Sequence, residues 1–302
     1  MMIPRQFRIP AFALAFLVSL FLSAPGASAS RLAESLPPLE EDTFVFYVWS
    51  DTHFDGRDHV GLRDDAVDDM NRLAEEHLPA GYGLCDPVAF VLHAGDITAN
   101  AREEMWQNDD GHTDNDFLSC ISRLNWPVFE VSGNHDADGG RPYILQGIAE
   151  RHGEQSYSFE YGGVHFIGLG LTRGAPRPDS EELAWLEEEM KGIDKSTPII
   201  LWQHFNFNDD AAWDPFYQAI SEHNIALLIH GHTHRHNRYR WRGMDVWDAG
   251  HNDGRVNAWS TIPSTISVMK VENGRLFASH YITTEDRWDT TFMLDKPLHE
   301  DE

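Results

Sequence analysis

Five short segments of this chain place metal-binding side chains directly after apolar runs. They are Asp51-Thr52-His53, Gly95-Asp96, Gly133-Asn134-His135-Asp136, His204 and Gly231-His232-Thr233-His234. Imidazole suits first-row transition metals, and carboxylate and amide oxygens also accept Mn or Mg. Each apolar run is typical of a β-strand, and ligands of open α/β sheets bind beyond the carboxyl ends of strands. The sequence therefore predicts one polynuclear metal site assembled from several strand ends.

The five segments differ in how specifically each one indicates a metal site. An Asp-x-His or a Gly-Asp pair is uninformative alone, and Gly-Asn-His-Asp is moderately specific. Gly-His-Thr-His is stronger because it brings two imidazoles to one strand end. The complete set in this order is very hard to obtain by chance, so the interpretation depends on the ensemble.

The ordered set resembles the pattern of the calcineurin-like metallophosphoesterase family, D-x-H, G-D, G-N-H-[DE], H and G-H-x-H, over residues 44–234. The resemblance implies an α/β fold, a four-layer α/β/β/α sandwich of two mixed sheets. It also implies two divalent metal ions per chain, drawn from Mn, Fe, Zn, Co or Mg. The first ion would be bound by Asp51, His53, Asp96 and His234. The second would be bound by Asp96, Asn134, His204 and His232, so that Asp96 bridges the two.

The resemblance also implies that His135 faces the substrate and does not bind a metal. Hydroxide held by the ions would attack phosphorus, and His135 would protonate the leaving alkoxide as a general acid. The protein phosphatase branch carries G-D-x-x-D-R-G, but this chain has Ala99 where the second acidic residue is expected. We therefore expect Asp136 to orient His135. Purple acid phosphatases lack the first His of the set, so His53 argues against that branch as well.

The predicted activity is hydrolysis of small phosphate monoesters or diesters, and the sequence leaves the choice between the two open. A different class of function is an exported protein that binds divalent metal without catalysis. A third alternative is a metallo-amidase or lactamase that acts on carbonyl carbon. His135 favours a hydrolase, because a storage site has no use for an acid beside its metals. Arg141 and Arg177 are candidate phosphate clamps, with solvated surface arginines as the alternative.

Residues 1–29 have the pattern of a secretory signal peptide. Arg5 and Arg8 precede an apolar run over residues 10–22, and Ala27-Ser28-Ala29 offers a cleavage site. The run is too short for a membrane span of about 20 apolar residues. We expect export to the periplasm or the medium without stable membrane insertion, with an uncleaved anchor as the alternative.

The formal net charge of −26 disfavours polyanionic partners. Such a chain repels nucleic acid and anionic membranes at long range, so we expect neither as a partner. The chain has only two cysteines, Cys85 and Cys120. In an oxidising compartment they favour a disulfide, and two separate buried thiols are the alternative.

The remaining sequence is the length of one catalytic domain. We expect a Pro-containing linker over residues 30–41, the metallophosphoesterase domain over residues 42–284 and an acidic tail over residues 285–302. Asp179 or Ser180 should cap a helix that ends near Lys191, and Asn273-Gly274 should form a tight hairpin turn. His93, His165 and His230 lie within predicted strands and are expected to be hydrogen-bonded core groups.

Overall fold

The computed structural model describes residues 29–39, 42–55, 62–107, 116–171, 175–252 and 263–299. Two six-stranded sheets form its centre. The first has the order β12-β11-β10-β1-β2-β3. Its strands are β1 (Thr43–Trp49), β2 (Val88–His93), β3 (Val128–Glu130), β10 (Thr265–Glu272), β11 (Arg275–Ile282) and β12 (Arg287–Pro297). Strands β1, β2 and β3 are parallel, whereas β10, β11 and β12 pair antiparallel, so the sheet is mixed.

The second sheet has the order β4-β5-β6-β7-β9-β8. Its strands are β4 (Tyr157–Tyr161), β5 (Val164–Gly168), β6 (Ile199–Trp202), β7 (Ile225–His230), β8 (His236–Trp241) and β9 (Met244–Ala249). Strands β5, β6, β7 and β9 run parallel, and the hairpins β4–β5 and β8–β9 close the two edges. Parallel strands end at the same edge of a sheet, which gives each sheet one edge where several loops meet.

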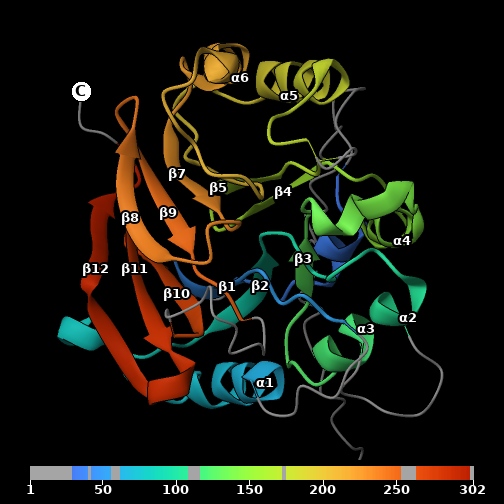
Figure 1. Cartoon of the computed structure of the whole chain (residues 1–302). Coiled ribbons are helices and arrows are strands. Elements are labelled where there is room, and N and C mark those ends of the chain that lie inside the picture. Colours follow the sequence, from blue (N-terminus) through green and yellow to red (C-terminus); the bar gives the residue numbers. More distant parts are fainter. Residues whose placement is uncertain are drawn as a thin grey trace, which may run out of the picture.

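Helices cover the outer faces of the two sheets (Figure 1). The first sheet is flanked by α1 (Leu62–Leu73), α2 (Glu103–Trp106) and α3 (Phe117–Ile121), and the second by α5 (Ser180–Gly192) and α6 (Asp214–Ile220). Helix α4 (Tyr143–His152) lies at the side of the molecule. Short 3-10 helices are η1 (Arg31–Ser35), η2 (Pro79–Gly81), η3 (His135–Gly140), η4 (Ala211–Trp213) and η5 (Thr283–Glu285). The predicted four-layer α/β/β/α sandwich is confirmed.

Aromatic side chains fill the space between the two sheets. Phe46 and Phe90 of the first sheet stack with ring centroids 5.3 Å apart, and Phe166 of the second sheet meets Phe90 edge-on at 5.1 Å. Burial of each such ring contributes roughly 1.5–3 kcal/mol. A second cluster, which includes Leu186 and Phe216, packs α5 and α6 against the outer face of the second sheet. These cores fix the strand ends of both sheets relative to one another.

Local signals in the sequence are confirmed where they could be tested. Asp179 caps α5 through a capping box with Glu182, a pattern that satisfies the first backbone N–H groups of a helix. Asn273 and Gly274 both have positive φ, 50° and 70°, as a tight hairpin turn between β10 and β11 requires.

The structure adds detail at both expected ends of the domain and differs from the expected pairing of the cysteines. The described part of the predicted linker is ordered: Ser30 is buried, its Oγ lies 2.9 Å from His152 Nδ1, and η1 follows it. Most of the predicted tail forms β12, because its residues complete the ladder of β11. Cys85 and Cys120 are both buried free thiols, which agrees with the alternative of two separate thiols and not with a disulfide.

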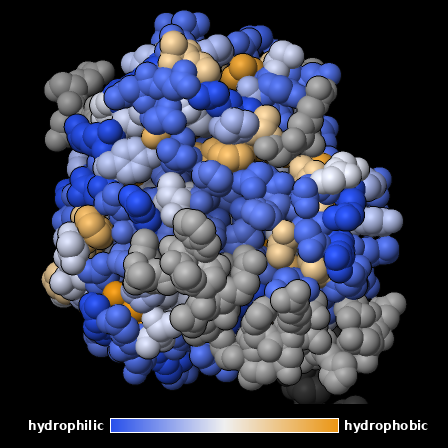
Figure 2. Space-filling view, in the orientation of Figure 1, coloured by the Kyte–Doolittle hydropathy of each residue, from blue (hydrophilic) through white to orange (hydrophobic). Residues whose placement is uncertain are grey.

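The predicted signal peptide lies outside the described residues except for Ala29. Among the residues that are described, no helix is both long and apolar enough to cross a membrane. On the face shown in Figure 2, hydrophilic residues predominate and apolar ones are scattered.

Candidate metal centre

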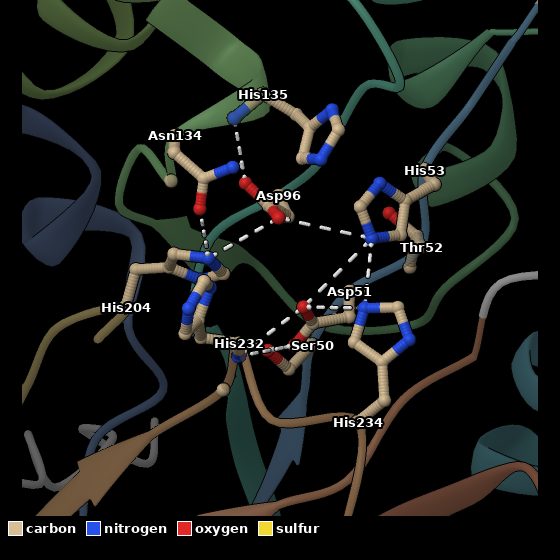
Figure 3. Close-up of polar contacts among 12 residues, drawn as sticks. Ser50, Asp51, Thr52, His53, Asp96, Asn134, His135, His204, His232 and His234 are labelled. Carbon is tan, nitrogen blue, oxygen red and sulfur yellow. Dashed lines mark hydrogen bonds and ion pairs between the residues drawn. The ribbon is translucent and has the colours of Figure 1, made fainter. Parts of the chain in front are cut away.

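The five segments meet at the carboxyl ends of β1, β2, β3, β6 and β7 (Figure 3). Backbone hydrogen bonds interlock the loops: Asp51 N donates to Gly95 O at 3.0 Å, and His53 N donates to Asp96 O at 3.0 Å. In the other sheet Gly231 N donates to the carbonyl of His204 at 3.1 Å. The predicted site residues, distant in sequence, therefore share one location.

Five of the proposed ligands have a left-handed backbone. The φ angles are 52° at Asp51, 44° at His53, 52° at Asp96, 67° at His232 and 56° at His234. Non-glycine residues seldom adopt positive φ, and such strain concentrates at functional sites. The interlocked loops hold these residues in conformations that turn their side chains toward a common centre.

Two glycines allow the loops to approach closely. A Cβ atom at Gly133 would overlap the carboxylate of Asp96, and one at Gly231 would overlap the side chains of Ser50 and Asp51. Any other residue at either position would push a ligand loop away, so glycine is required here by space alone.

The Asp51 carboxylate has one oxygen occupied and one directed at the centre. Oδ2 accepts hydrogen bonds from Ser50 Oγ at 2.5 Å and from His232 N at 2.9 Å, and the same N–H reaches Oδ1 at 3.2 Å. Oδ1 lies 3.8 Å from His53 Nε2 and 3.3 Å from His234 Nε2. The hydrogen bonds to Oδ2 thus fix the orientation in which Oδ1 is presented.

Asp96 is arranged in the same way but faces both sets of ligands. Its Oδ1 accepts from His135 N at 2.8 Å. Its Oδ2 lies 3.7 Å from His53 Nε2 and 3.2 Å from His204 Nε2. One oxygen thus stands between a histidine of each set, the position expected of a bridging carboxylate.

The imidazole rings are also oriented by groups outside the centre. His204 Nδ1 lies 2.9 Å from Ala94 O, which leaves Nε2 to face the site, 3.2 Å from Asn134 Oδ1. Such an outer hydrogen bond is typical of metal-binding histidines. The Nε2 atoms of His53 and His234 approach each other to 3.1 Å.

The charges of the site suit cations. Burial opposes ionisation of Asp96, but the nearby His204 outweighs it and lowers the pKa of Asp96 to about 2. Burial also disfavours the imidazolium form of His204, yet Asp96 and Asp51 raise its pKa to about 9. The pKa of His53 falls to about 3 because burial dominates there. A proton on His204 thus balances buried carboxylates in a place where a metal cation would do the same.

Three groups of side chains have the geometry to hold a metal ion within the described part of the chain. Their ligand atoms lie within 4.8 Å of one another. The groups are Asp51, His53 and His234; Asp96, His204 and His232; and His53, Asp96 and His135. The first two each contain three of the four residues in a ligand set that the resemblance implies, without Asp96 in the first and Asn134 in the second. The third brings His135 next to the ligands, with its ring edge-on to that of His53 at 4.8 Å.

The expectation that Asp136 orients His135 is wrong. His135 Nδ1 lies 2.8 Å from the backbone oxygen of Ala99. The fully buried Asp136 carboxylate accepts hydrogen bonds from Ile97 N at 3.0 Å, Thr98 N at 2.8 Å, Thr98 Oγ1 at 3.0 Å and Gly133 N at 2.9 Å. Asp136 therefore fastens the loop after β2 to the loop after β3. A carbonyl orients His135 because the chain has no acidic side chain at position 99.

The histidines expected to be core groups are confirmed as such. His93 Nε2 lies 3.1 Å from Thr52 Oγ1, His165 Nε2 lies 2.8 Å from Glu189, and His230 is held between Gly231 O and Tyr239. His251 is also buried, and its ring stacks on that of His234 with centroids 5.2 Å apart.

Sequence reasoning missed two residues that support the ligands. Ser50 bonds to Asp51 as described, and its place beside the ligand is a usable signal. Arg63 of α1 is buried and donates from Nε to Thr52 O at 2.7 Å and from Nη2 to His53 O at 2.6 Å. No local sequence pattern indicates that Arg63 contacts this segment, because the contact depends on how α1 packs against the sheet.

Comparisons with known proteins agree with this geometry. None of the curated proteins compared with this chain matches it. Among solved structures, GAP50, the anchor in the inner membrane complex of Plasmodium, is similar over 86% of this chain and 90% of its own, with 12% identity and a TM-score of 0.53. At this identity the likeness shows the fold alone.

Two further solved structures are similar at lower TM-scores. Vps29 of Entamoeba histolytica, complexed with Zn²⁺, is 14% identical with a TM-score of 0.41, over 84% of this chain and 99% of its own. Phosphopantetheinyl hydrolase of Mycobacterium tuberculosis is 13% identical with a TM-score of 0.43, over 71% of this chain and 91% of its own. The family model described as Calcineurin-like phosphoesterase matches residues 44–236, which include all the proposed ligands. The chain therefore belongs to the calcineurin-like phosphoesterase family.

Proposed function

We propose that this protein is an exported hydrolase of small phosphate monoesters or diesters that uses two divalent metal ions. Calcineurin-like phosphoesterases bind divalent metals, and the chain has candidate ligand groups for them. The observation that carries the proposal is the position of Asp96 Oδ2 between His53 and His204, which suits a carboxylate shared by two ions.

The donor set fits such ions on structural grounds. Carboxylate oxygens, an amide oxygen and imidazole nitrogens converge, and the opposite edge of the Asp51, Asp96 and His204 side chains is already hydrogen-bonded. The first ion would be held by Asp51, His53, Asp96 and His234, and the second by Asp96, Asn134, His204 and His232. When bound, a pair of ions polarises a phosphate ester and makes a water molecule more acidic.

His135 supplies the proton that the leaving alcohol needs. Its Nδ1 faces Ala99 O, which favours the tautomer with a proton on Nδ1 and leaves Nε2 to exchange a proton with the substrate. Phosphoester cleavage creates an alkoxide, and protonation by a positioned acid contributes typically 100- to 10,000-fold to the rate. Asp136 keeps the loop that carries His135 in register with the loop that carries Asp96.

The test is turnover of para-nitrophenyl phosphate and its bis ester, with metal content measured on the same preparation. We expect hydrolysis of at least one reporter and about two divalent ions per chain. His223→Ala is the matched control, because that histidine is hydrogen-bonded to Met190 O away from the centre. Bound metal without turnover under any restoring metal would instead identify an exported metal-binding protein.

A further inference from the structure

Arg141 presents its guanidinium beside the loop that orients His135. It follows η3, and its Nη1 donates to Asn100 O at 2.6 Å. Asn100 directly follows Ala99, whose carbonyl faces His135 Nδ1 at 2.8 Å. The general acid and the guanidinium are thus attached to adjacent peptide units, whose Cα atoms are about 3.8 Å apart. This connection places the guanidinium within roughly 10 Å of the His135 ring.

Among the residues that the structure describes, no carboxylate lies within ion-pairing distance of the Arg141 guanidinium, and its hydrogen bond goes to the neutral carbonyl of Asn100. By contrast Arg177, the other candidate phosphate clamp, is paired with Asp210. A guanidinium has five N–H donors, so most of those on Arg141 remain for a ligand.

We propose that Arg141 binds a second anionic group, a carboxylate or a phosphate, on the alcohol portion of the phosphate ester. The inference rests on the proposed function, in which His135 stands on the side of the leaving alcohol. A group a few bonds beyond the ester oxygen then reaches the guanidinium, which pairs with carboxylate or phosphate through two parallel hydrogen bonds. The local cation also offsets the repulsion that a strongly acidic protein exerts on an anionic substrate. The substrate class is therefore phosphorylated hydroxy acids or bisphosphates.

Matched substrate pairs test this assignment on the metal-loaded protein. Glycerol 3-phosphate and 3-phosphoglycerate differ by a carboxylate, and propyl phosphate and propane-1,3-diol bisphosphate differ by a phosphate. We expect wild type to prefer the more anionic member of at least one pair. Arg141→Gln should lower kcat/KM for that member by about 10- to 100-fold, mainly through KM, as loss of a charged hydrogen-bonded pair does. The less anionic member should change by less than about twofold.

Three further variants separate this role from general effects. Arg141→Lys keeps the positive charge but cannot form two parallel hydrogen bonds. We therefore expect a partial loss of kcat/KM for the more anionic substrate. Arg177→Gln and Arg235→Gln each remove one positive charge elsewhere, the second beside the ligand His234, and both should leave the preference intact. Melting curves establish that each variant is folded. If Arg141→Gln does not fold, Arg141→Lys replaces it as the test variant.

The role of Arg141 and the proposed function are refuted by different results. Wild type that hydrolyses simple esters without preferring an anionic alcohol overturns the role of Arg141 and leaves the proposed function standing. The same holds if Arg141→Gln slows both members of a pair equally, or if Arg235→Gln removes the preference. Absence of turnover of every ester with every restoring metal refutes the proposed function, and the role of Arg141 with it.

Discussion

Glu130 offers a quantitative test of how the loop that carries Asn134 and His135 is anchored. It is the last residue of β3 and is fully buried. Its carboxylate pairs with Arg151 and lies 3.2 Å from His152 Nε2, both at the end of α4. Because β3 precedes the loop and α4 follows it, this network closes the loop at both ends.

Replacement of Glu130 by Gln should cost about 3 kcal/mol at neutral pH. Burial alone would raise the pKa of the carboxyl, but His152 and Arg151 outweigh burial and lower it from 4.5 to about 2. Each unit of pKa difference between folded and unfolded protein is worth about 1.4 kcal/mol. The charged form therefore contributes about 3 kcal/mol to the free energy of unfolding, and a neutral amide loses that contribution.

The pH dependence has a definite sign. Because the folded pKa is depressed, the contribution is present above pH 4.5 and is lost as pH falls toward 2. At pH 3.5 wild type has already lost about 1.4 kcal/mol of it, so the difference between wild type and Glu130→Gln should shrink to about 2 kcal/mol. Acidification should thus bring the two proteins closer in stability.

Urea unfolding in chelator, followed by tryptophan fluorescence at pH 7 and pH 3.5, measures both values. Glu222→Gln is the control, since Glu222 pairs with Lys195 on the surface and the change should have little effect. The reasoning is refuted if Glu130→Gln is as stable as wild type at pH 7, or if the difference grows on acidification.

The remaining predictions concern the metal centre and the thiols. Chelation should abolish ester hydrolysis and Mn, Zn, Co or Fe should restore it, so full activity of metal-free protein would contradict the two-metal proposal. His135→Ala should keep its metals and lose about 100-fold or more in turnover, whereas Asp96→Ala should lose metals and activity together; equal metal loss in both would assign His135 to the ligands. Asp136→Asn should reduce metal content along with turnover, because an amide cannot accept from all of the four donors around it; loss of turnover with metals intact would restore the view that it orients the acid. Cys85 and Cys120 should alkylate only after unfolding, since both are buried and burial raises the pKa of Cys85 to about 12; a mass two hydrogens lower under non-reducing conditions would reveal a disulfide.

Local patterns were sufficient for the strands that precede the five segments, the α5 cap and the hairpin turn at Asn273-Gly274. These depend on the preferences of neighbouring residues, which are present in the sequence itself. The ligand types and their order also predicted the candidate metal centre, because Asp, Asn and His side chains gathered at several strand ends form a donor set that suits divalent metal ions.

Contacts between distant segments needed the tertiary structure. Whether Ser30 packs against the domain depends on its contact with His152 of α4, and the structure of residues 287–297 depends on the edge of β11 that they pair with. The sequence allowed Cys85 and Cys120 to pair in an oxidising compartment, but in the fold both are buried free thiols.

The same distinction between residue type and tertiary contact applies to the candidate site. The sequence by itself determined which side chains could bind metal, because ligand chemistry belongs to residue type. Only the tertiary structure decided what holds them: Asp136 joins two loops, Ala99 contributes a backbone carbonyl to His135, and Arg63 reaches the Asp-x-His segment from α1. A backbone carbonyl has no signature in sequence, and a hydrogen bond between loops exists only once the strands that carry them have paired.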